Sequence, residues 1–171
     1  MNGNNLEIER KYLIRMPEEA RLAAMPGVQI WDIVQTYLTD GADGCTRRVR
    51  SVRMNGETRY THTVKHRVTV LSCEEMEEEV SREAYGHLLC EADPSLSAIE
   101  KRRYRIPHAG QTLEIDLYSF WRDRATLEVE LSSEDQKVEL PDWIQVVREV
   151  TGERAYKNRY LAEEIPMEDI Q

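Results

Sequence analysis

The chain has 171 residues, a formal net charge of -9, 40% hydrophobic residues and 32% charged residues. This length predicts one domain over residues 1–171 with a substantial hydrophobic core, and it leaves too little chain for two. The acidic balance argues against nonspecific nucleic-acid binding, which needs a basic surface. It does not argue against a small anionic ligand, because a local basic pocket can coexist with an acidic exterior.

The three cysteines, Cys45, Cys73 and Cys90, show no C-x-x-C spacing. Their odd number and spacing favour free, packed thiols in a reducing compartment. The sequence has neither a signal-peptide-like stretch nor a run of about 18 apolar residues. We therefore expect a cytoplasmic protein without a membrane partner. The oligomeric state stays open, with a homodimer among the alternatives.

Apolar residues recur with a period of two along most of the chain, which predicts β-strands. Turn-forming residues separate these stretches, and Asn55-Gly56 predicts the clearest hairpin. Eight strands are predicted, over residues 5–14, 29–39, 45–54, 58–68, 73–80, 98–106, 111–118 and 125–133. The fold class is therefore mainly β (α+β), an antiparallel domain with peripheral helices.

Helical patterns fill only the longer gaps between these strands. Pro17 and Pro141 suit first helical positions, Ser81 suits an N-cap, and Gly152 suits a helix end. Helices are predicted over residues 17–25, 81–92, 141–150 and 154–163.

Six short stretches carry like-signed charges at alternate positions. In a strand, residues i and i+2 point to the same face, so each pair places two repelling charges side by side. A protein that repeats this arrangement is expected to need it, for metal ions at acidic pairs and for a polyanion at basic pairs. The pairs are Glu7 with Glu9, Arg48 with Arg50, Glu77 with Glu79, Lys101 with Arg103, Glu114 with Asp116, and Glu128 with Glu130.

Two interpretations of these strand faces stay open. The first is an ordinary sheet with one solvated face and one core face. The second is a closed barrel with the charged faces inward, since eight antiparallel strands suffice to enclose a small ligand. Strand faces of a single sign favour the barrel, because a solvated face usually mixes signs. Carboxylates inside it would bind Mg²⁺ or Mn²⁺, and Arg and Lys would bind phosphate oxygens.

The order of these motifs resembles that of the CYTH superfamily, the triphosphate tunnel metalloenzymes. Glu7-x-Glu9-x-Lys11 is similar to its E-x-E-x-K signature, and later segments match its strands in turn. These are Arg48-Val49-Arg50 (R-x-R), Thr63-Val64-Lys65 (T-x-K), Glu77-Glu78-Glu79 (E-x-E), Lys101-Arg102-Arg103 (K-x-R), Glu114-Ile115-Asp116, Glu128-Val129-Glu130 (E-x-E), and the tail Val150-Thr151-Gly152 with Tyr156-Lys157-Asn158. The resemblance spans nearly the whole chain.

The resemblance implies a closed eight-stranded antiparallel tunnel that binds a triphosphate with one or two divalent cations, Mg²⁺ or Mn²⁺. Lys11 is implied to position the attacking water, with an ion pair to neighbouring acids as the alternative. Tyr37 is implied to lie near Lys11, with an ordinary barrel aromatic as the alternative. The implied metal ligands are Glu7, Glu9, Asp116, Glu128 and Glu130; the implied phosphate ligands are Arg48, Arg50, Lys65, Lys101, Arg103 and Lys157; Glu77 and Glu79 are supporting residues.

The implied function is metal-dependent hydrolysis of inorganic tripolyphosphate, because the start of the chain, its Q-x-Y-L strand and its tail resemble small bacterial members with that activity. A class IV adenylate cyclase is one alternative, although no base-reading element is evident. Thiamine triphosphate hydrolysis is another, and it needs an aromatic or acidic pocket at one end of the tunnel. The sequence does not place Trp31, Trp121 or Trp143 there, and core or surface packing is the commoner role of such residues. A noncatalytic polyphosphate- or nucleotide-binding module is the third.

Overall fold

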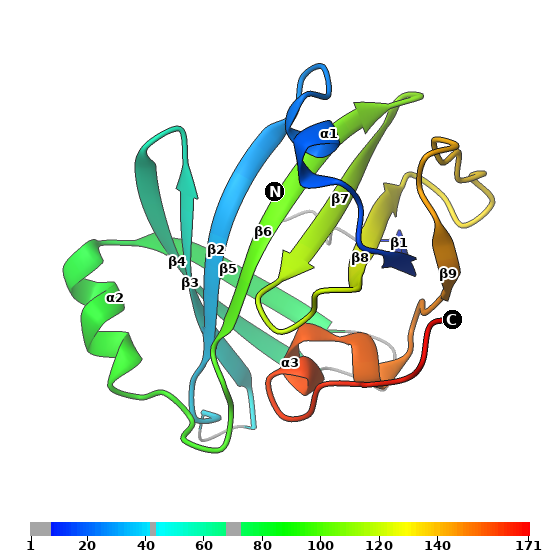
Figure 1. The fold of residues 1–171 in the computed structure, drawn as a ribbon. Coiled ribbons are helices and arrows are strands. Elements are labelled where there is room, and N and C mark those ends of the chain that lie inside the picture. The colour runs from blue at the N-terminus through cyan, green and yellow to red at the C-terminus, as the bar shows by residue number, and fades with distance from the viewer. Residues whose placement is uncertain (1–7, 42–43, 68–72) are drawn as a thin grey trace.

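The fold is a single antiparallel sheet with short helices at its periphery (Figure 1). A computed structural model describes residues 8–41, 44–67 and 73–171. The strands are β1 (Ile8–Arg15), β2 (Gln29–Tyr37), β3 (Thr46–Met54), β4 (Glu57–Arg67), β5 (Cys73–Val80), β6 (Ile99–His108), β7 (Gln111–Tyr118), β8 (Arg124–Leu131) and β9 (Val146–Glu149). The helices are α1 (Glu19–Ala23), α2 (Arg82–Leu89), the 3₁₀ turn η1 (Arg154–Tyr156) and α3 (Asn158–Leu161).

Local sequence signals account for most of these elements. All eight predicted strands are present. Asn55 and Gly56 have positive φ angles of 51° and 81°, as a tight turn between β3 and β4 requires. The Ser81 hydroxyl accepts a hydrogen bond from the Ala84 backbone N–H at 3.0 Å and caps α2. None of the helices formed by the described residues is long and apolar enough to cross a membrane.

The helix predicted over residues 141–150 is wrong, because this segment contains β9. Leu13 on β1 and Arg148 on β9 are register partners, so β9 pairs with an edge that only the folded sheet offers. The sheet thus has nine strands in the order β5-β4-β3-β2-β6-β7-β8-β1-β9. This corrects the predicted number of eight, and within the described residues β5 and β9 end the sheet without pairing to each other.

The main hydrophobic core lies on one face of β1, β6, β7 and β8. It contains Tyr104, Leu113, Ile115 and Leu127, and Leu22 of α1 packs into it. These residues alternate along each strand with the charged positions, so the charges occupy the opposite face. We call that opposite face, on which Lys11, Gln35, Arg50, Lys101, Arg103, Asp116 and Glu128 lie, the charged face.

Candidate active site

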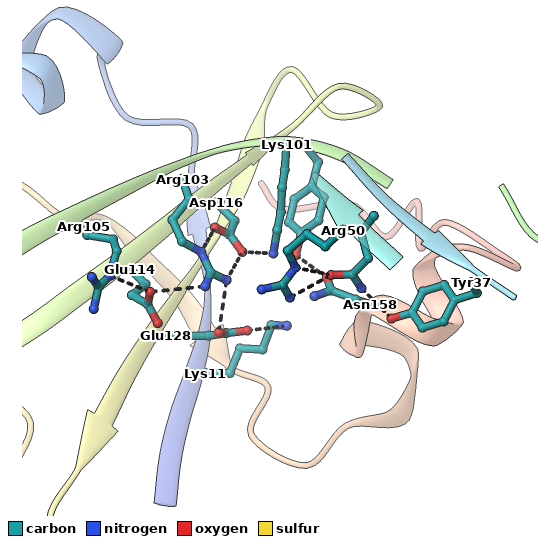
Figure 2. A network of polar contacts seen from close by, with 12 residues as sticks. Lys11, Tyr37, Arg50, Lys101, Arg103, Arg105, Glu114, Asp116, Glu128 and Asn158 are labelled. Atoms are coloured by element: carbon teal, nitrogen blue, oxygen red, sulfur yellow. Dashed lines mark hydrogen bonds and ion pairs between the residues drawn. The ribbon is translucent and has the colours of Figure 1, made fainter. Parts of the chain in front are cut away.

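The charged face is buried although it is polar. The Lys101 side chain is 0% exposed and the Asp116 side chain 1% exposed. Arg50 on β3 and Lys11 on β1 point into the same space in Figure 2, although four strands separate β3 from β1 in the sheet. The sheet therefore curls around its charged face, and the interpretation of that face as solvated is wrong.

Asp116 on β7 binds two basic residues of β6, Lys101 and Arg103. Arg103, its register partner, donates from Nε to Oδ1 at 2.7 Å and from Nη2 to Oδ2 at 2.8 Å. Lys101 Nζ donates to Oδ2 at 2.6 Å. Burial alone would raise the pKa of Asp116, but the attraction of Lys101 and Arg103 outweighs it and holds the pKa below its ordinary value.

Burial favours the neutral form of both basic partners, but the net change in pKa differs between them. Burial lowers the pKa of Lys101 to about 8, and the nearby Asp116 opposes this shift only in part. For Arg103 burial also favours the neutral form, but Asp116, Glu114 and Glu128 outweigh it and raise the pKa. At neutral pH the face therefore holds both bases charged beside an ionised Asp116.

Two further carboxylates extend this network toward β1 and the end of β6. Glu128 Oε1 lies 2.9 Å from Lys11 Nζ, and Glu128 Oε2 lies 3.6 Å from Arg103 Nη2. Glu114 Oε2 accepts from Arg103 at 3.2 Å and from Arg105 at 3.0 Å. Lys11 thus has the ion-pair role that the sequence offered as one alternative.

Arg50 differs from these bases because a neutral side chain holds it. Its Nε and Nη2 donate to Gln35 Oε1 at 3.2 Å and 2.8 Å. Gln35 Nε2 in turn donates to the Tyr37 hydroxyl oxygen at 2.7 Å. Burial and the repulsion of Arg48 and Arg103 lower the pKa of Arg50 to about 10. This part of the charged face therefore has a surplus of positive charge.

The strands β3, β4 and β5 supply a second group of charges. Arg48 Nη2 lies 3.2 Å from Glu75 and 3.9 Å from Glu77, and Lys65 Nζ lies 3.0 Å from Glu75. Glu77 also accepts a hydrogen bond from the Thr63 hydroxyl at 2.9 Å. Glu77 therefore contacts a predicted phosphate ligand. Glu79 is exposed and is the register partner of Thr61.

The predicted metal ligands are only partly brought together. Glu9 and Glu130 are register partners on β1 and β8, and both are exposed. Asp116 and Glu128 are engaged with bases, and Glu7 lies outside the described residues. Across the parts of the chain that are described, no group of three or more His, Cys, Asp or Glu side chains is placed to hold a metal ion.

The C-terminal tail approaches the same face through Asn158. Its Oδ1 accepts a hydrogen bond from the Tyr118 hydroxyl at 2.7 Å, and Tyr118 follows Asp116 by two positions on β7. Lys157 is exposed at the junction between η1 and α3. The tail thus approaches the site, but its hydrogen bond to the sheet comes from Asn158 and not from Lys157.

Sequence reasoning missed several polar residues of the charged face: Gln35, Arg105, Glu114 as a site residue, Tyr118 and Asn158. Gln35 and Glu114 carried a signal, since each lies two positions from a predicted site residue on the same strand. Of the cysteines, Cys45 and Cys90 are free, and Cys90 is exposed, against the expectation that it packs. The Cys73 side chain lies outside the described residues.

Known proteins are similar to this chain in both sequence and fold. The inorganic triphosphatase of Nitrosomonas europaea is 33% identical over 165 residues, which cover 94% of this chain and 99% of that protein. The crystal structure of the inorganic triphosphatase NE1496 has a TM-score of 0.61 at 28% identity, over 94% of this chain and 96% of that one. PH1819 of Pyrococcus horikoshii OT3 has a TM-score of 0.52 at 17% identity, over 75% and 81%, which shows the fold alone. No family model matches the chain.

A curled antiparallel sheet with buried acids and bases on its inner face, together with these relatives, defines a class of metal-dependent phosphoanhydride hydrolases. The chain belongs to the CYTH superfamily of triphosphate tunnel metalloenzymes, in the family of the inorganic triphosphatases. The resemblance drawn from the sequence motifs is confirmed.

Proposed function

We propose that this chain hydrolyses inorganic tripolyphosphate to pyrophosphate and orthophosphate, on the charged face of a sheet that closes into a tunnel around the substrate. The observation that carries the proposal is the surplus of positive charge at Arg50. Its guanidinium is held by the neutral Gln35 and repelled by Arg48 and Arg103. A bound polyanion would relieve that repulsion, and the full-length similarity to an inorganic triphosphatase supports the choice of polyanion.

The phosphate groups replace carboxylates as the ion-pair partners of several bases of the charged face. Arg103 and Lys101 lie within ion-pair distance of Asp116 and can exchange that carboxylate for phosphate oxygens without leaving the charged face. The assigned phosphate ligands are Arg48, Arg50, Lys65, Lys101, Arg103 and Lys157, with Glu77 and Glu79 orienting the bases of β3 and β4. Positioning and electrostatic stabilisation of the transferring phosphoryl group then account for catalysis.

The acidic residues suit a hard divalent cation. Glu9 and Glu130 face each other directly across β1 and β8, and a cation between these strands would reduce the repulsion of their like charges. Their oxygens are ligands that Mg²⁺ and Mn²⁺ prefer. We assign the metal to Glu9 and Glu130 with Glu7, and to Asp116 and Glu128 once phosphates have taken their bases. Bound there, the cation supplies neutralisation of charge on the phosphate oxygens.

The chain's own residues arrange the hydrolytic step. Water attacks one terminal phosphorus, the bond from that phosphorus to the bridging oxygen breaks, and pyrophosphate leaves with the bond electrons, while both protons of the water stay with the orthophosphate that forms. Lys11 lies beside Glu128 at 2.9 Å and we assign it to hold the attacking water with that carboxylate. Burial raises the pKa of Tyr37, against the opposing effects of Arg48 and Gln35, so its hydroxyl stays protonated and can donate to a phosphate oxygen.

Thiamine triphosphate or another organic triphosphate is the second candidate substrate, and the position of Trp31 is the observation that bears on it. Trp31 is the register partner of Arg103 and so shares the charged face. The Arg105 guanidinium already lies 4.7 Å from the centroid of its ring. One face of the indole is thus covered, and we expect an aromatic substrate group to compete poorly with Arg105. Trp143 packs against the main core, and Trp121 is buried in a second hydrophobic cluster with Leu13 and Tyr156, so neither is available for this role.

One assay tests the proposal. The purified chain is given tripolyphosphate, thiamine triphosphate and ATP in turn, with Mg²⁺ or Mn²⁺, and released phosphate is measured. We expect the fastest release from tripolyphosphate. Cyclic AMP as the main product from ATP, or faster release from thiamine triphosphate, would overturn the substrate assignment. Tight tripolyphosphate binding without any turnover would instead identify a binding module.

A further inference from the structure

Gln35 is a fully buried amide in the middle of the charged face. Its side chain is 0% exposed, and both ends of the amide are used, by Arg50 on the neighbouring strand and by Tyr37 two positions along β2. A buried amide between two residues assigned to the substrate is placed to control both. No motif of the sequence assigned Gln35 a role.

The chemistry of the two partners fixes which way the amide points. A guanidinium has donors only, so Gln35 must present Oε1 to Arg50. The Nε2 group therefore faces Tyr37 and donates to its hydroxyl oxygen. Because that oxygen accepts from Gln35, the phenolic proton is directed away from Gln35 and is left for another acceptor.

A neutral acceptor has a consequence that a carboxylate would not have. Arg103 is held by Asp116, Glu114 and Glu128, which offset much of its charge. Gln35 holds the Arg50 guanidinium through two hydrogen bonds and leaves its charge undiminished. Arg50 is therefore oriented by two hydrogen bonds to a neutral oxygen while it keeps its attraction for an anion.

We infer that Gln35 is a positioning residue for phosphate binding, which orients the Arg50 guanidinium without neutralising it and turns the Tyr37 proton toward the substrate. The inference rests on the proposed triphosphatase function. It deepens that function by naming a residue that fixes the orientation of Arg50 without reducing its charge. Gln35 acts through Arg50 and Tyr37 and need not touch the substrate.

Gln35→Glu separates this role from a merely structural one. A carboxylate still accepts from both Arg50 nitrogens, so the variant should unfold at the same temperature as the wild type or a higher one. It neutralises Arg50 and accepts the Tyr37 proton, so KM for tripolyphosphate should rise by about tenfold or more. Gln35→Met, which removes all three of these hydrogen bonds at similar volume, should also raise KM. Thr36→Val, on the opposite face of β2, should leave KM and kcat unchanged.

A mutant cycle and a binding measurement complete the test. If Gln35 acts through Arg50 and Tyr37, adding Gln35→Met to the double variant Arg50→Met, Tyr37→Phe should raise KM no further. Tripolyphosphate binding is followed by calorimetry without divalent metal, so the result does not depend on turnover. Wild-type affinity in a folded Gln35→Glu variant, or additive effects in the cycle, would overturn this inference alone. A wild type that neither binds nor hydrolyses tripolyphosphate would overturn the proposed function with it.

Discussion

Lys11 Nζ lies 2.9 Å from Glu128 Oε1, and the two residues are register partners on β1 and β8. Both side chains are nearly buried, with 9% and 13% exposed. Burial alone would raise the pKa of Glu128, but Lys11 attracts the carboxylate and the pKa is lowered. The pair places a cation and an anion of the charged face side by side on neighbouring strands.

Removing Lys11 should destabilise the fold because it leaves Glu128 with only the more distant Arg103. We expect Lys11→Met to lower the free energy of unfolding by about 2 kcal/mol. Urea denaturation measures this. The double variant Lys11→Met, Glu128→Gln should recover most of the stability but not the activity. A Lys11→Met variant as stable as the wild type would show that the ion pair contributes nothing.

Arg50→Lys should weaken substrate binding more than it slows turnover. Lysine keeps the charge but loses the planar group that Gln35 holds through two nitrogens. We expect KM for tripolyphosphate to rise about tenfold, with a smaller change in kcat. Arg53→Lys is the matched control, since Arg53 is exposed on the other face of β3. Equal KM values for the two variants would remove Arg50 from the binding site.

Glu9→Gln and Glu130→Gln should each lose most activity while the far-ultraviolet circular dichroism stays unchanged. The change removes one charge from the facing pair, so a higher Mg²⁺ or Mn²⁺ concentration should be needed for half-maximal rate. Glu100→Gln, at an exposed position on the other face of β6, serves as the control. Near-full turnover of either variant at saturating metal would mean that the metal lies elsewhere.

The rate should fall in mildly alkaline solution because Lys101 loses its proton there. Burial lowers the pKa of Lys101 to about 8 in the free protein, so the base is cationic below that pH and neutral above it. We expect kcat/KM for tripolyphosphate to have a descending limb near pH 8, since kcat/KM reports the free enzyme. Lys101→Arg should move the limb to higher pH. If the descending limb stays near pH 8 in Lys101→Arg, the titration of another group causes it.

The strands could be predicted from the sequence better than the ends of the sheet. All eight predicted strands are present because Glu, Arg and Lys alternate with Leu, Ile and Val over lengths that suit strands. β9 was missed, since its pairing depends on the edge of β1 and not on its own residues. The motifs singled out Lys101, Arg103 and Asp116 as site residues, whereas Gln35 carries no charge and was marked only by its place two positions from Tyr37 on the same strand.

The sequence by itself determined the period of the strands, the sign of each strand face and the family. Only the tertiary structure decided which face is enclosed, because alternation marks two faces without saying which of them water reaches. Leu113, Ile115 and Leu127 are buried on the outer face of the sheet, under α1 and adjacent segments of the same chain. The acids and bases, which alternate with them, therefore lie on the inner face of the curled sheet. There most of the buried charges, with the exception of Arg50, are offset by an opposite charge on a neighbouring strand, as Lys101 and Asp116 show at 2.6 Å. That pairing depends on register, which no single strand specifies.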